Sequence, residues 1–268
     1  MFDSFDREIT YLRISVTDRC NLRCTYCMPP GGVRLKKSSE ILSYEEIVQI
    51  VRVAARLGIS KIRLTGGEPL IRKNLISLIR SLKNIEGIEE VTLTTNGVLL
   101  ARMAPELKRA GLDRINVSLD TLVPKKYEEM TRGGSIRRVL EGIDAASQAG
   151  FKNTKLNMVL IPGFNEKEVE HLKAFCKERG LHLQRINHYA LPDRNSINRA
   201  YEAEKPLSCH RCNRIRLTAD AKLKPCLFSD IEVPVDFADI DSCIKLAVLN
   251  KPESGRGCST RGNWEIGG

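Results

Sequence analysis

Residues 18–28 read Asp-Arg-Cys-Asn-Leu-Arg-Cys-Thr-Tyr-Cys-Met, which places Cys20, Cys24 and Cys27 in the spacing CxxxCxxC. Three thiolates are one fewer than the four ligands that a closed zinc or iron–sulfur site normally takes. A 4Fe-4S cluster held by three cysteines keeps one iron open, and that iron can bind and reduce a small molecule. The stretch therefore predicts a reactive iron–sulfur site. A zinc knuckle completed by a distant fourth ligand is the alternative.

The sequence around these cysteines alternates between short β-rich runs and amphipathic helical patterns. Strands are expected at 11–16, 61–65, 91–95, 114–119, 154–161 and 182–186, and helices at 43–57, 74–83, 100–110, 136–149 and 166–178. Ser43 and Glu46 form a capping box at the start of the first helix. Helices of this length between strands indicate βαβ units and a parallel sheet. Because six units are too few for a closed eightfold barrel, the predicted α/β fold is an incomplete (β/α)6 TIM-like barrel.

The alternation stops after Ile186. Residues 192–206 are polar and turn-rich, and a second group of cysteines starts at Cys209. We therefore expect two domains. Residues 1–190 would form the partial barrel, and residues 191–268 a small C-terminal iron–sulfur domain.

Composition narrows the class of protein. The chain has no apolar run of about 18 residues and does not start like a signal peptide, so we expect a cytoplasmic protein with no membrane association. Nine cysteines in such a chain favour metal or redox chemistry over disulfides. The net charge of +10 fits nucleic acid, an anionic substrate or a solvated surface. Only 5% of the residues are aromatic, and no basic run is interleaved with stacking rings of the kind that single-strand binders use. A small polyanion would explain a basic pocket without nucleic acid, but the charge alone does not decide between these partners.

Two motifs point to a particular chemistry. Tyr26 completes CxxxCxYC, and Gly66-Gly67-Glu68-Pro69 follows the second expected strand. With these motifs the chain resembles the radical S-adenosylmethionine (SAM) superfamily, and the strand ends 94–97 and 116–120 fit the same pattern. The resemblance implies that Cys20, Cys24 and Cys27 hold the cluster. It also implies a SAM site at the carboxyl ends of the strands, made by Tyr26, Gly66, Gly67, Glu68, Thr95, Asn96, Ser118 and Arg185.

A second group of three cysteines, Cys209, Cys212 and Cys226, has the spacing CxxC-x13-C. One interpretation is a second 4Fe-4S cluster with an open iron. The other is a zinc ribbon that takes Cys243, Cys258 or His210 as its fourth ligand. Cys176 falls in a helical pattern and is expected to be a packed thiol, while Cys243 and Cys258 are expected to be free.

Asn-Arg-Ile-Arg follows the second CxxC, and the chain ends in Gly267-Gly268. With these features the chain resembles the MoaA family, the GTP 3′,8-cyclases that begin molybdenum cofactor biosynthesis. The resemblance implies catalytic roles for Arg214, Arg216 and the two terminal glycines, which would thread into the cavity. It also implies a cradle for the GTP triphosphate, made by Arg13, Lys61, Arg63, Lys155, Arg214 and Arg216. The segment 187–208 is far shorter than in most members of the family.

The resemblance implies a lyase that uses two 4Fe-4S clusters and SAM to convert GTP to 3′,8-cyclo-7,8-dihydro-GTP. The implied partners are a one-electron donor of the flavodoxin or ferredoxin type and a downstream pterin-forming enzyme, and the protein would be a monomer or homodimer. Another radical SAM enzyme with an auxiliary cluster, acting on a different nucleotide or a peptide, is the alternative enzyme. A zinc-stabilised RNA-binding module is the non-enzymatic alternative, which the six βα units and Gly-Gly-Glu-Pro disfavour.

Overall fold

Strands and helices alternate from Tyr11 to Asn187 in the computed structural model, which describes residues 1–198, 200–206 and 208–267. Six parallel strands from this region and three later strands form one sheet, in the order β6-β5-β4-β3-β2-β1-β7-β8-β9. The strands are β1 (Tyr11–Ser15), β2 (Lys61–Thr65), β3 (Glu90–Thr95), β4 (Arg114–Ser118), β5 (Lys155–Leu160), β6 (His182–Asn187), β7 (Arg214–Leu217), β8 (Lys222–Lys224) and β9 (Val233–Pro234).

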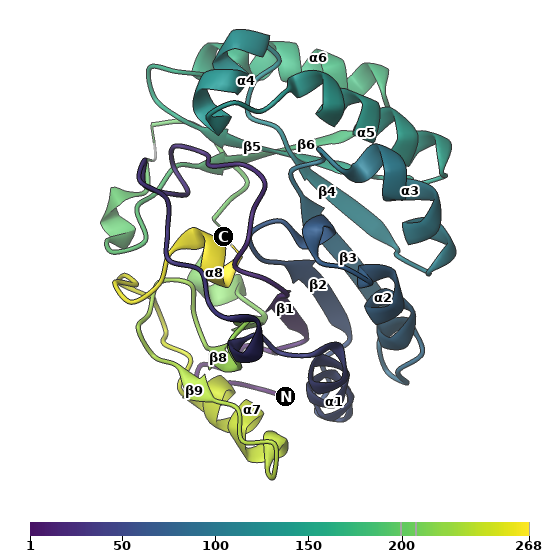
Figure 1. Cartoon of the computed structure of the whole chain (residues 1–268). Coiled ribbons are helices and arrows are strands. Elements are labelled where there is room, and N and C mark those ends of the chain that lie inside the picture. The colour runs from purple at the N-terminus through teal and green to yellow at the C-terminus, as the bar shows by residue number, and fades with distance from the viewer. Residues whose placement is uncertain (199, 207, 268) are drawn as a thin grey trace.

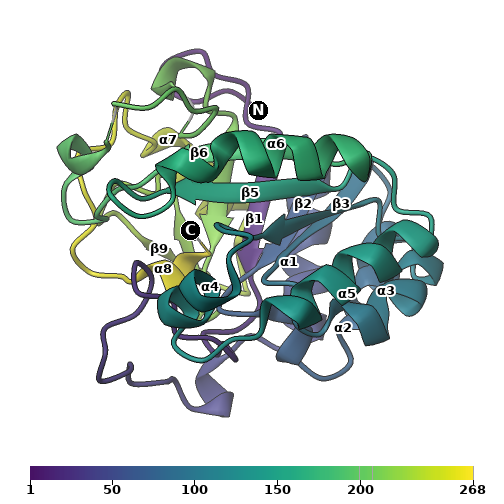
Figure 2. The same ribbon diagram turned by 90° about the horizontal axis from the view of Figure 1, so that it is seen from above.

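Helices cover the outer, convex face of the curved sheet, as Figure 1 shows. The α-helices are α1 (Tyr44–Arg56), α2 (Leu75–Lys83), α3 (Leu100–Arg109), α4 (Pro124–Thr131), α5 (Ile136–Gln148), α6 (Val169–Glu178), α7 (Ile240–Leu249) and α8 (Asn263–Ile266). Short 3-10 turns are η1 (Ser38–Glu40), η2 (Pro69–Ile71), η3 (Glu166–Glu168), η4 (Arg194–Ser196) and η5 (Cys209–Arg211). The short helix α8 lies on the other, concave side of the sheet (Figures 1 and 2). No helix among the described residues has the length and apolar character needed to cross a membrane.

The two faces of the sheet differ because side chains alternate along a strand. Leu12 and Ile14 of β1 and Ile62 and Leu64 of β2 are fully buried, in the same core as Ile50 of α1. The residues between them point to the concave face and are polar or charged. The fold therefore presents a polar surface on the side where α8 lies.

The predicted strands and helices are confirmed, and so is the incomplete barrel. The sheet does not close, because its two edge strands, β6 and β9, do not pair with each other. The predicted capping box is present: Glu46 N donates to Ser43 Oγ at 3.1 Å, and Ser43 N donates to Glu46 Oε2 at 2.6 Å. Within residues 11–187, two details differ from the prediction. The helix expected from residue 166 begins with the 3-10 turn η3, and α4, which starts at Pro124, was not predicted.

The part of the chain after residue 190 continues the barrel sheet. Strand β7 pairs in parallel with β1, and β8 and β9 follow in antiparallel pairing. The sequence did not predict these three strands. The division into two domains near residue 190 stays a prediction, since one sheet runs through both parts.

Candidate active site

The cysteine loop, residues 17–37, is held against the end of β2 by Gly66 and Gly67. Gly67 N donates to Thr17 O at 2.8 Å, and the next amide donates to Arg19 O at 2.7 Å. A Cβ on Gly66, whose φ is +139°, would lie 2.4 Å from Thr17 O, and a Cβ on Gly67 would lie 2.1 Å from Arg19 O. Glycine permits this approach. The pair therefore fixes the cysteines relative to the strand ends.

The carboxylate of Glu68 ties the end of β2 to the end of β3. Glu68 Oε1 accepts from Thr95 Oγ1 at 2.7 Å and from Leu70 N at 2.9 Å, while Oε2 accepts from Asn96 N at 2.7 Å. Burial raises the pKa of Glu68 to about 7, although these hydrogen bonds oppose the rise. Three of the predicted SAM-binding residues thus form one hydrogen-bonded unit.

The first three cysteines line one cavity of about 180 Å³ at the carboxyl ends of the strands. Its walls include the predicted SAM-binding residues Tyr26, Gly66, Gly67, Thr95, Asn96 and Ser118. Burial raises the pKa of Cys20, Cys24 and Cys27, that of Cys27 to about 12, so the three free thiols are protonated at neutral pH. Leu22 N donates to Cys20 Sγ at 3.4 Å, a contact that stabilises a bound thiolate.

Four further polar residues line this cavity: Asp120, which closes the predicted strand end 116–120, and Asn157, His188 and Tyr189, which sequence reasoning missed. Tyr26 OH donates to Asp120 Oδ2 at 2.9 Å, and Val159 N donates to Asp120 Oδ1 at 2.6 Å. Burial raises the pKa of Asp120 to about 6 and lowers the pKa of His188. The sequence signal for Asp120 was its place in the polar strand end 116–120 of the expected barrel. The segment that holds His188 and Tyr189 has no comparable motif.

The concave face carries four arginines in one row across neighbouring strands. The strand register pairs Arg13 of β1 with Arg216 of β7 on one side and with Arg63 of β2 on the other. Arg63 is level with Thr92 of β3, and Thr92 is level with Arg114 of β4. Because residues that are level in a sheet share a face, Arg13, Arg63, Arg114 and Arg216 form what we call the arginine row.

The other predicted substrate-binding residues lie on the same face. Arg214 and Lys61 are each level with Tyr11, one row below Arg13. Lys155 of β5 is level with Asn116 of β4. Lys61 is exposed at the start of β2, whereas Arg63, Lys155 and Arg214 are partly buried. The structure therefore brings the predicted cradle together on one surface.

Burial and mutual repulsion act on the charges of this face. Burial lowers the pKa of Arg13, Arg63 and Arg216, and neighbouring arginines lower it further. The same causes lower the pKa of Lys155, and that of Lys205 to about 8. Among the described residues, no carboxylate lies within ion-pair distance of Arg63, Arg214, Arg216, Lys155 or Lys205, and the nearby Glu90 pairs with Arg114 at 2.7 Å. Cations gathered without counter-ions favour a bound polyanion.

Buried polar atoms without partners lie on this concave face as well. Tyr11 OH, Thr94 Oγ1, Asn157 Oδ1 and both side-chain polar atoms of Asn116 have no hydrogen-bond partner in the described part of the chain. Buried polar groups in folded proteins are normally satisfied. The set therefore fits a polar ligand that completes these contacts.

The second group of cysteines lies at the opposite end of the strands. Cys209 and Cys212 precede β7, and the hairpin of β7 with the antiparallel β8 brings Cys226 back to them. All three line a cavity of about 50 Å³ together with Arg214 and Arg216. Since β7 runs parallel to β1, the arginine row lies between the two cysteine groups.

A buried lysine, Lys251, contacts this second group and was also missed. Its Nζ donates to Cys212 Sγ at 3.4 Å, to Arg214 O at 2.8 Å and to Pro225 O at 2.9 Å. Burial alone would raise the pKa of Cys212, but the charges of Lys251 and Arg214 lower it. Lys251 stands far from the cysteines in the sequence and has no motif around it.

The C-terminal tail enters the concave face between the two cysteine groups. Arg216 Nη1 donates to Ile266 O at 3.1 Å and to Gly267 O at 2.7 Å. Gly267 has a φ of +60°, and a Cβ on it would lie 2.3 Å from Thr65 Cγ2. Gly267 therefore lies beside Thr65, one of the residues that line the first cysteine cavity, and its threading into the cavity stays a prediction. Gly268 lies outside the described residues.

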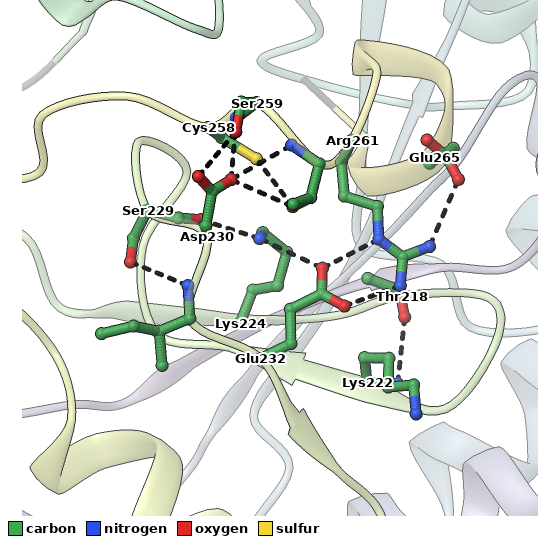
Figure 3. A network of polar contacts seen from close by, with 12 residues as sticks. Thr218, Lys222, Lys224, Ser229, Asp230, Glu232, Cys258, Ser259, Arg261 and Glu265 are labelled. Atoms are coloured by element: carbon green, nitrogen blue, oxygen red, sulfur yellow. Dashed lines mark hydrogen bonds and ion pairs between the residues drawn. The ribbon is translucent and has the colours of Figure 1, made fainter.

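An ion-pair network fastens this tail to the β8–β9 hairpin (Figure 3). Arg261 donates to Glu232 through Nε at 2.8 Å and Nη2 at 2.7 Å. Its Nη1 donates to Asp220 at 3.0 Å and to Glu265 of α8 at 3.2 Å. Lys224, whose side chain is fully buried, contacts Glu232 at 3.2 Å. The network orients α8 and hence Gly267.

Arg185 is not brought to the SAM cavity. On β6 it is level with Met158, which is fully buried on the helical side of the sheet. Its guanidinium pairs instead with Glu204 at 2.6 Å and with Glu202 at 3.6 Å, both in the short segment after β6. The structure thus separates Arg185 from the other predicted SAM-binding residues.

All nine cysteines are free thiols, and Cys176 and Cys258 are buried. Within the described ranges, no three His, Cys, Asp or Glu side chains are arranged around a single metal ion. The iron–sulfur ligands remain predictions, and they rest on cysteine spacing and on the two shared cavities.

Comparison with known proteins shows the family. Residues 14–176 match the family model of the radical SAM superfamily. The chain is 44% identical to the GTP 3′,8-cyclase of Moorella thermoacetica, over 88% of this chain and 86% of that protein. It is 38% identical to the GTP 3′,8-cyclase of Alkaliphilus oremlandii, over 320 aligned positions that cover all of both chains. Since this chain has 268 residues, it is shorter than that relative.

Solved structures share the fold at low identity. The structure of anSMEcpe with bound AdoMet has a TM-score of 0.65 at 14% identity, over 91% of this chain and 78% of that chain. Streptococcus suis SuiB bound to S-adenosylmethionine has a TM-score of 0.62 at 18% identity, over 82% of this chain and 60% of that chain. The family model and the sequence identity to the curated relatives together show that the chain belongs to the radical SAM superfamily and, within it, to the GTP 3′,8-cyclase family.

Proposed function

We propose that this chain is a radical SAM GTP 3′,8-cyclase, a lyase that converts GTP to 3′,8-cyclo-7,8-dihydro-GTP in the first step of molybdenum cofactor biosynthesis. The observation that carries the proposal is the arginine row on the concave face, between a cysteine group at each end of the strands. A nucleoside triphosphate is a polyanion, and closely spaced arginines and lysines on a partly buried surface are suited to bind it.

The residues at the carboxyl ends of the strands would hold the cofactors. Reductive cleavage of the SAM sulfonium to a hydrogen-abstracting carbon radical is the chemistry that a 4Fe-4S cluster and SAM supply when bound. Cys20, Cys24 and Cys27 would ligate the cluster, and the Gly66–Glu68 stretch would orient the amino group of SAM. The remaining predicted residues, Tyr26, Thr95, Asn96 and Ser118, would hold its ribose, carboxylate and adenine.

Asp120 has a supporting role in this assignment. Its two carboxylate oxygens accept from Tyr26 OH and from Val159 N, so it fixes the ring of Tyr26 against the cavity wall. We infer that Asp120 positions Tyr26.

The residues of the concave face would hold the substrate. Arg13, Arg63, Lys155 and Arg214 would neutralise the triphosphate, and Lys61 would meet it at the exposed end of the face. The second group, Cys209, Cys212 and Cys226, would ligate a second 4Fe-4S cluster that contacts the purine. Because the cysteine groups lie at opposite ends of β1 and β7, one nucleotide between them can face both.

Arg216 would act on the tail and on the substrate together. It donates to the carbonyls of Ile266 and Gly267, and its own pKa is lowered by burial and by Arg214. Its guanidinium carries five N–H donors, so Arg216 could hold the tail carbonyls and a ligand anion at the same time. We propose that this coupling closes the cavity and gives Gly267, and Gly268 beyond it, their part in catalysis.

The test is an anaerobic assay of the iron-reconstituted protein with SAM, GTP and dithionite, followed by mass spectrometry. We expect 5′-deoxyadenosine and a cyclised nucleotide in equal amounts, and neither product from Cys24→Ala. If SAM is cleaved while GTP stays unchanged, the substrate is a different nucleotide or a peptide, and the proposed activity is wrong.

A further inference from the structure

The outer side of the cysteine loop carries positive charge. Residues 19–37 contain five cations and no aspartate or glutamate. Lys36 turns inward and pairs with Asp220 at 3.2 Å and with Glu265 at 3.6 Å. The other four are exposed, namely Arg19, Arg23, Arg34 and Lys37. Leu35 lies among them and is 45% exposed, which gives this charged loop an apolar contact point.

A further exposed cation joins this loop from the end of α4. Arg132 Nη1 donates to Arg23 O at 2.9 Å and to Met28 O at 2.8 Å. Arg23 N in turn donates to Thr131 O at 3.2 Å, so the loop is fixed beside α4 (Figure 2). We call Arg19, Arg23, Arg34, Lys37 and Arg132 the basic rim. Within the described ranges none of the five has an acidic partner at ion-pair distance.

The basic rim lies on the solvent side of the first cysteine cavity. The other walls of that cavity are the ends of β2 to β5, together with Ile186, His188, Tyr189 and Asn263 of the C-terminal tail. Helices cover those strands from outside, and the tail covers the concave side (Figures 1 and 2). Cys20, Leu22, Cys24, Tyr26 and Cys27 of the cysteine loop line the cavity, while Arg19, Arg23, Arg34 and Lys37 of the same loop are exposed to solvent. The loop therefore lies between a cluster on the three cysteines and the basic rim.

We propose that the basic rim is the docking surface for an acidic one-electron carrier protein. The inference rests on the proposed function, because that chemistry needs one electron for each SAM cleaved. In this step the reduced carrier loses one electron and the cluster gains it, and no bond forms or breaks. Exposed arginines and lysines complement a carrier whose redox centre is ringed by carboxylates, and such complementarity speeds association.

The features of the rim fit a transient protein complex. Redox partners usually bury a small interface, for which one exposed leucine among charges is sufficient. Single-stranded nucleic acid would need aromatic rings on which bases stack. Tyr26, the aromatic residue of this loop, is turned inward to Asp120. The rim therefore favours an acidic protein over nucleic acid.

The rim can be tested with a charge-matched pair of variants of the reconstituted protein. The rim variant is Arg23→Gln/Arg34→Glu/Lys37→Glu, whose side chains have no role in the proposed cofactor or substrate sites. The control is Arg102→Gln/Arg109→Glu/Arg138→Glu, with the same change in net charge. Its three arginines are exposed on α3 and α5, on the other side of the molecule (Figure 2).

The first measurement is the rate at which the visible cluster absorbance bleaches after mixing with an acidic flavodoxin in its hydroquinone form. At low salt we expect the rim variant to react about tenfold or more slowly than wild type, because steering charge is lost. The control should stay within about twofold of wild type. With dithionite, a small reductant that needs no docking, all three proteins should cleave SAM at similar rates. Equal bleaching of the rim variant and wild type by flavodoxin would overturn the proposal.

Two further measurements use the wild-type chain. Added salt should slow its reduction by flavodoxin steeply, since exposed charges are screened; a salt-independent rate would contradict docking at the basic rim. A carbodiimide joins lysine amines to carboxylates, so oxidised flavodoxin should cross-link to Lys37. Cross-links confined to lysines outside the rim would overturn the proposal. If no cluster assembles, the proposed function fails, but the cross-link still tests the docking surface by itself.

Discussion

At the scale of single residues, Asp120 gives the site a pH dependence whose sign can be worked out. Burial raises its pKa in the folded protein to about 6, from an ordinary value of 3.8. A carboxyl with a raised pKa binds more protons when folded than when unfolded. Its contribution to stability is therefore present below pH 3.8 and is lost as the pH rises through about 6.

We predict that Asp120→Asn removes this loss in the metal-free protein. Between pH 5 and pH 7.5, wild type should lose about 1 kcal/mol more of its free energy of unfolding than Asp120→Asn does. Urea unfolding at the two pH values measures the difference. Tyr26→Phe should change the profile in the opposite direction. Losing the hydrogen bond from Tyr26 should raise the pKa of Asp120 further and enlarge the pH effect. Identical pH profiles for wild type and Asp120→Asn would contradict the assignment.

Arg214 is the residue that best tests the triphosphate cradle, because Arg216 also holds the tail. A charge-assisted contact to a buried ligand contributes about 1.5–3 kcal/mol, so Arg214→Ala should weaken GTP binding about ten- to a hundredfold. Lysine should restore little, since it lacks the planar fork of the guanidinium. Anaerobic calorimetry measures the affinity, with exposed Arg138→Ala of α5 as the control. Wild-type affinity in Arg214→Ala would favour a peptide substrate.

At the scale of elements, the sequence predicted those that repeat a local pattern. Six strands and five helices follow from hydrophobic period, capping and glycine positions, because these signals are local. Strands β7, β8 and β9 have two to four residues each, too few to show a period. Their pairing with β1 depends on contacts between residues some 200 positions apart, such as Arg13 with Arg216. The sequence therefore could not predict that the second cysteine group joins the barrel sheet.

The same reason explains which site residues were found. The six cluster cysteines and Gly66–Glu68 stand in compact motifs that can be recognised locally. Lys251 and Arg261 act through partners that are mostly more than 20 positions away, so no spacing identifies them. Arg185 was placed by resemblance, but the short segment after β6 supplies two glutamates that pair with it.

A further prediction concerns Arg261, which fastens the C-terminal tail to the sheet. Arg261→Met removes five hydrogen bonds to three carboxylates in a site where the arginine side chain is 8% exposed. Breaking a buried ion pair costs about 3 kcal/mol or more, because the acids are left without their partner. Hydrogen exchange in residues 258–267 should then quicken about tenfold or more. Arg256→Met, an exposed neighbour, is the control, and unchanged exchange in Arg261→Met would show that other contacts hold the tail.

Arg261 should also affect how tightly SAM cleavage is coupled to formation of the nucleotide product, because Gly267 follows α8 directly. With the tail loosened, SAM cleavage should persist while the yield of nucleotide product per SAM cleaved falls. Arg261→Lys should restore only part of that yield, since one ammonium group cannot reach Glu232, Asp220 and Glu265 together. A variant that loses both activities equally would indicate general unfolding instead.

At the scale of the whole molecule, one open sheet carries two cysteine groups at opposite ends and a cationic face between them. The parallel order of β7 and β1 makes this arrangement, since the first group follows β1 and the second precedes β7. Each group has its own cavity, and the lining residues of the two cavities do not overlap. Effects of changes in well-separated sites are usually independent, so the two ends should be separable by mutation.

We therefore predict different losses from Cys24→Ala and Cys212→Ala. Wild type should bind about eight iron atoms per chain, and each variant should keep roughly half of them. Cys24→Ala should form no 5′-deoxyadenosine, because the cluster that reduces SAM is lost. Cys212→Ala should still cleave SAM but make no cyclised nucleotide, because the purine loses its anchor. Iron, sulfide and zinc analysis with product detection checks both variants. Zinc at the second group, or loss of all iron in either variant, would contradict two independent clusters.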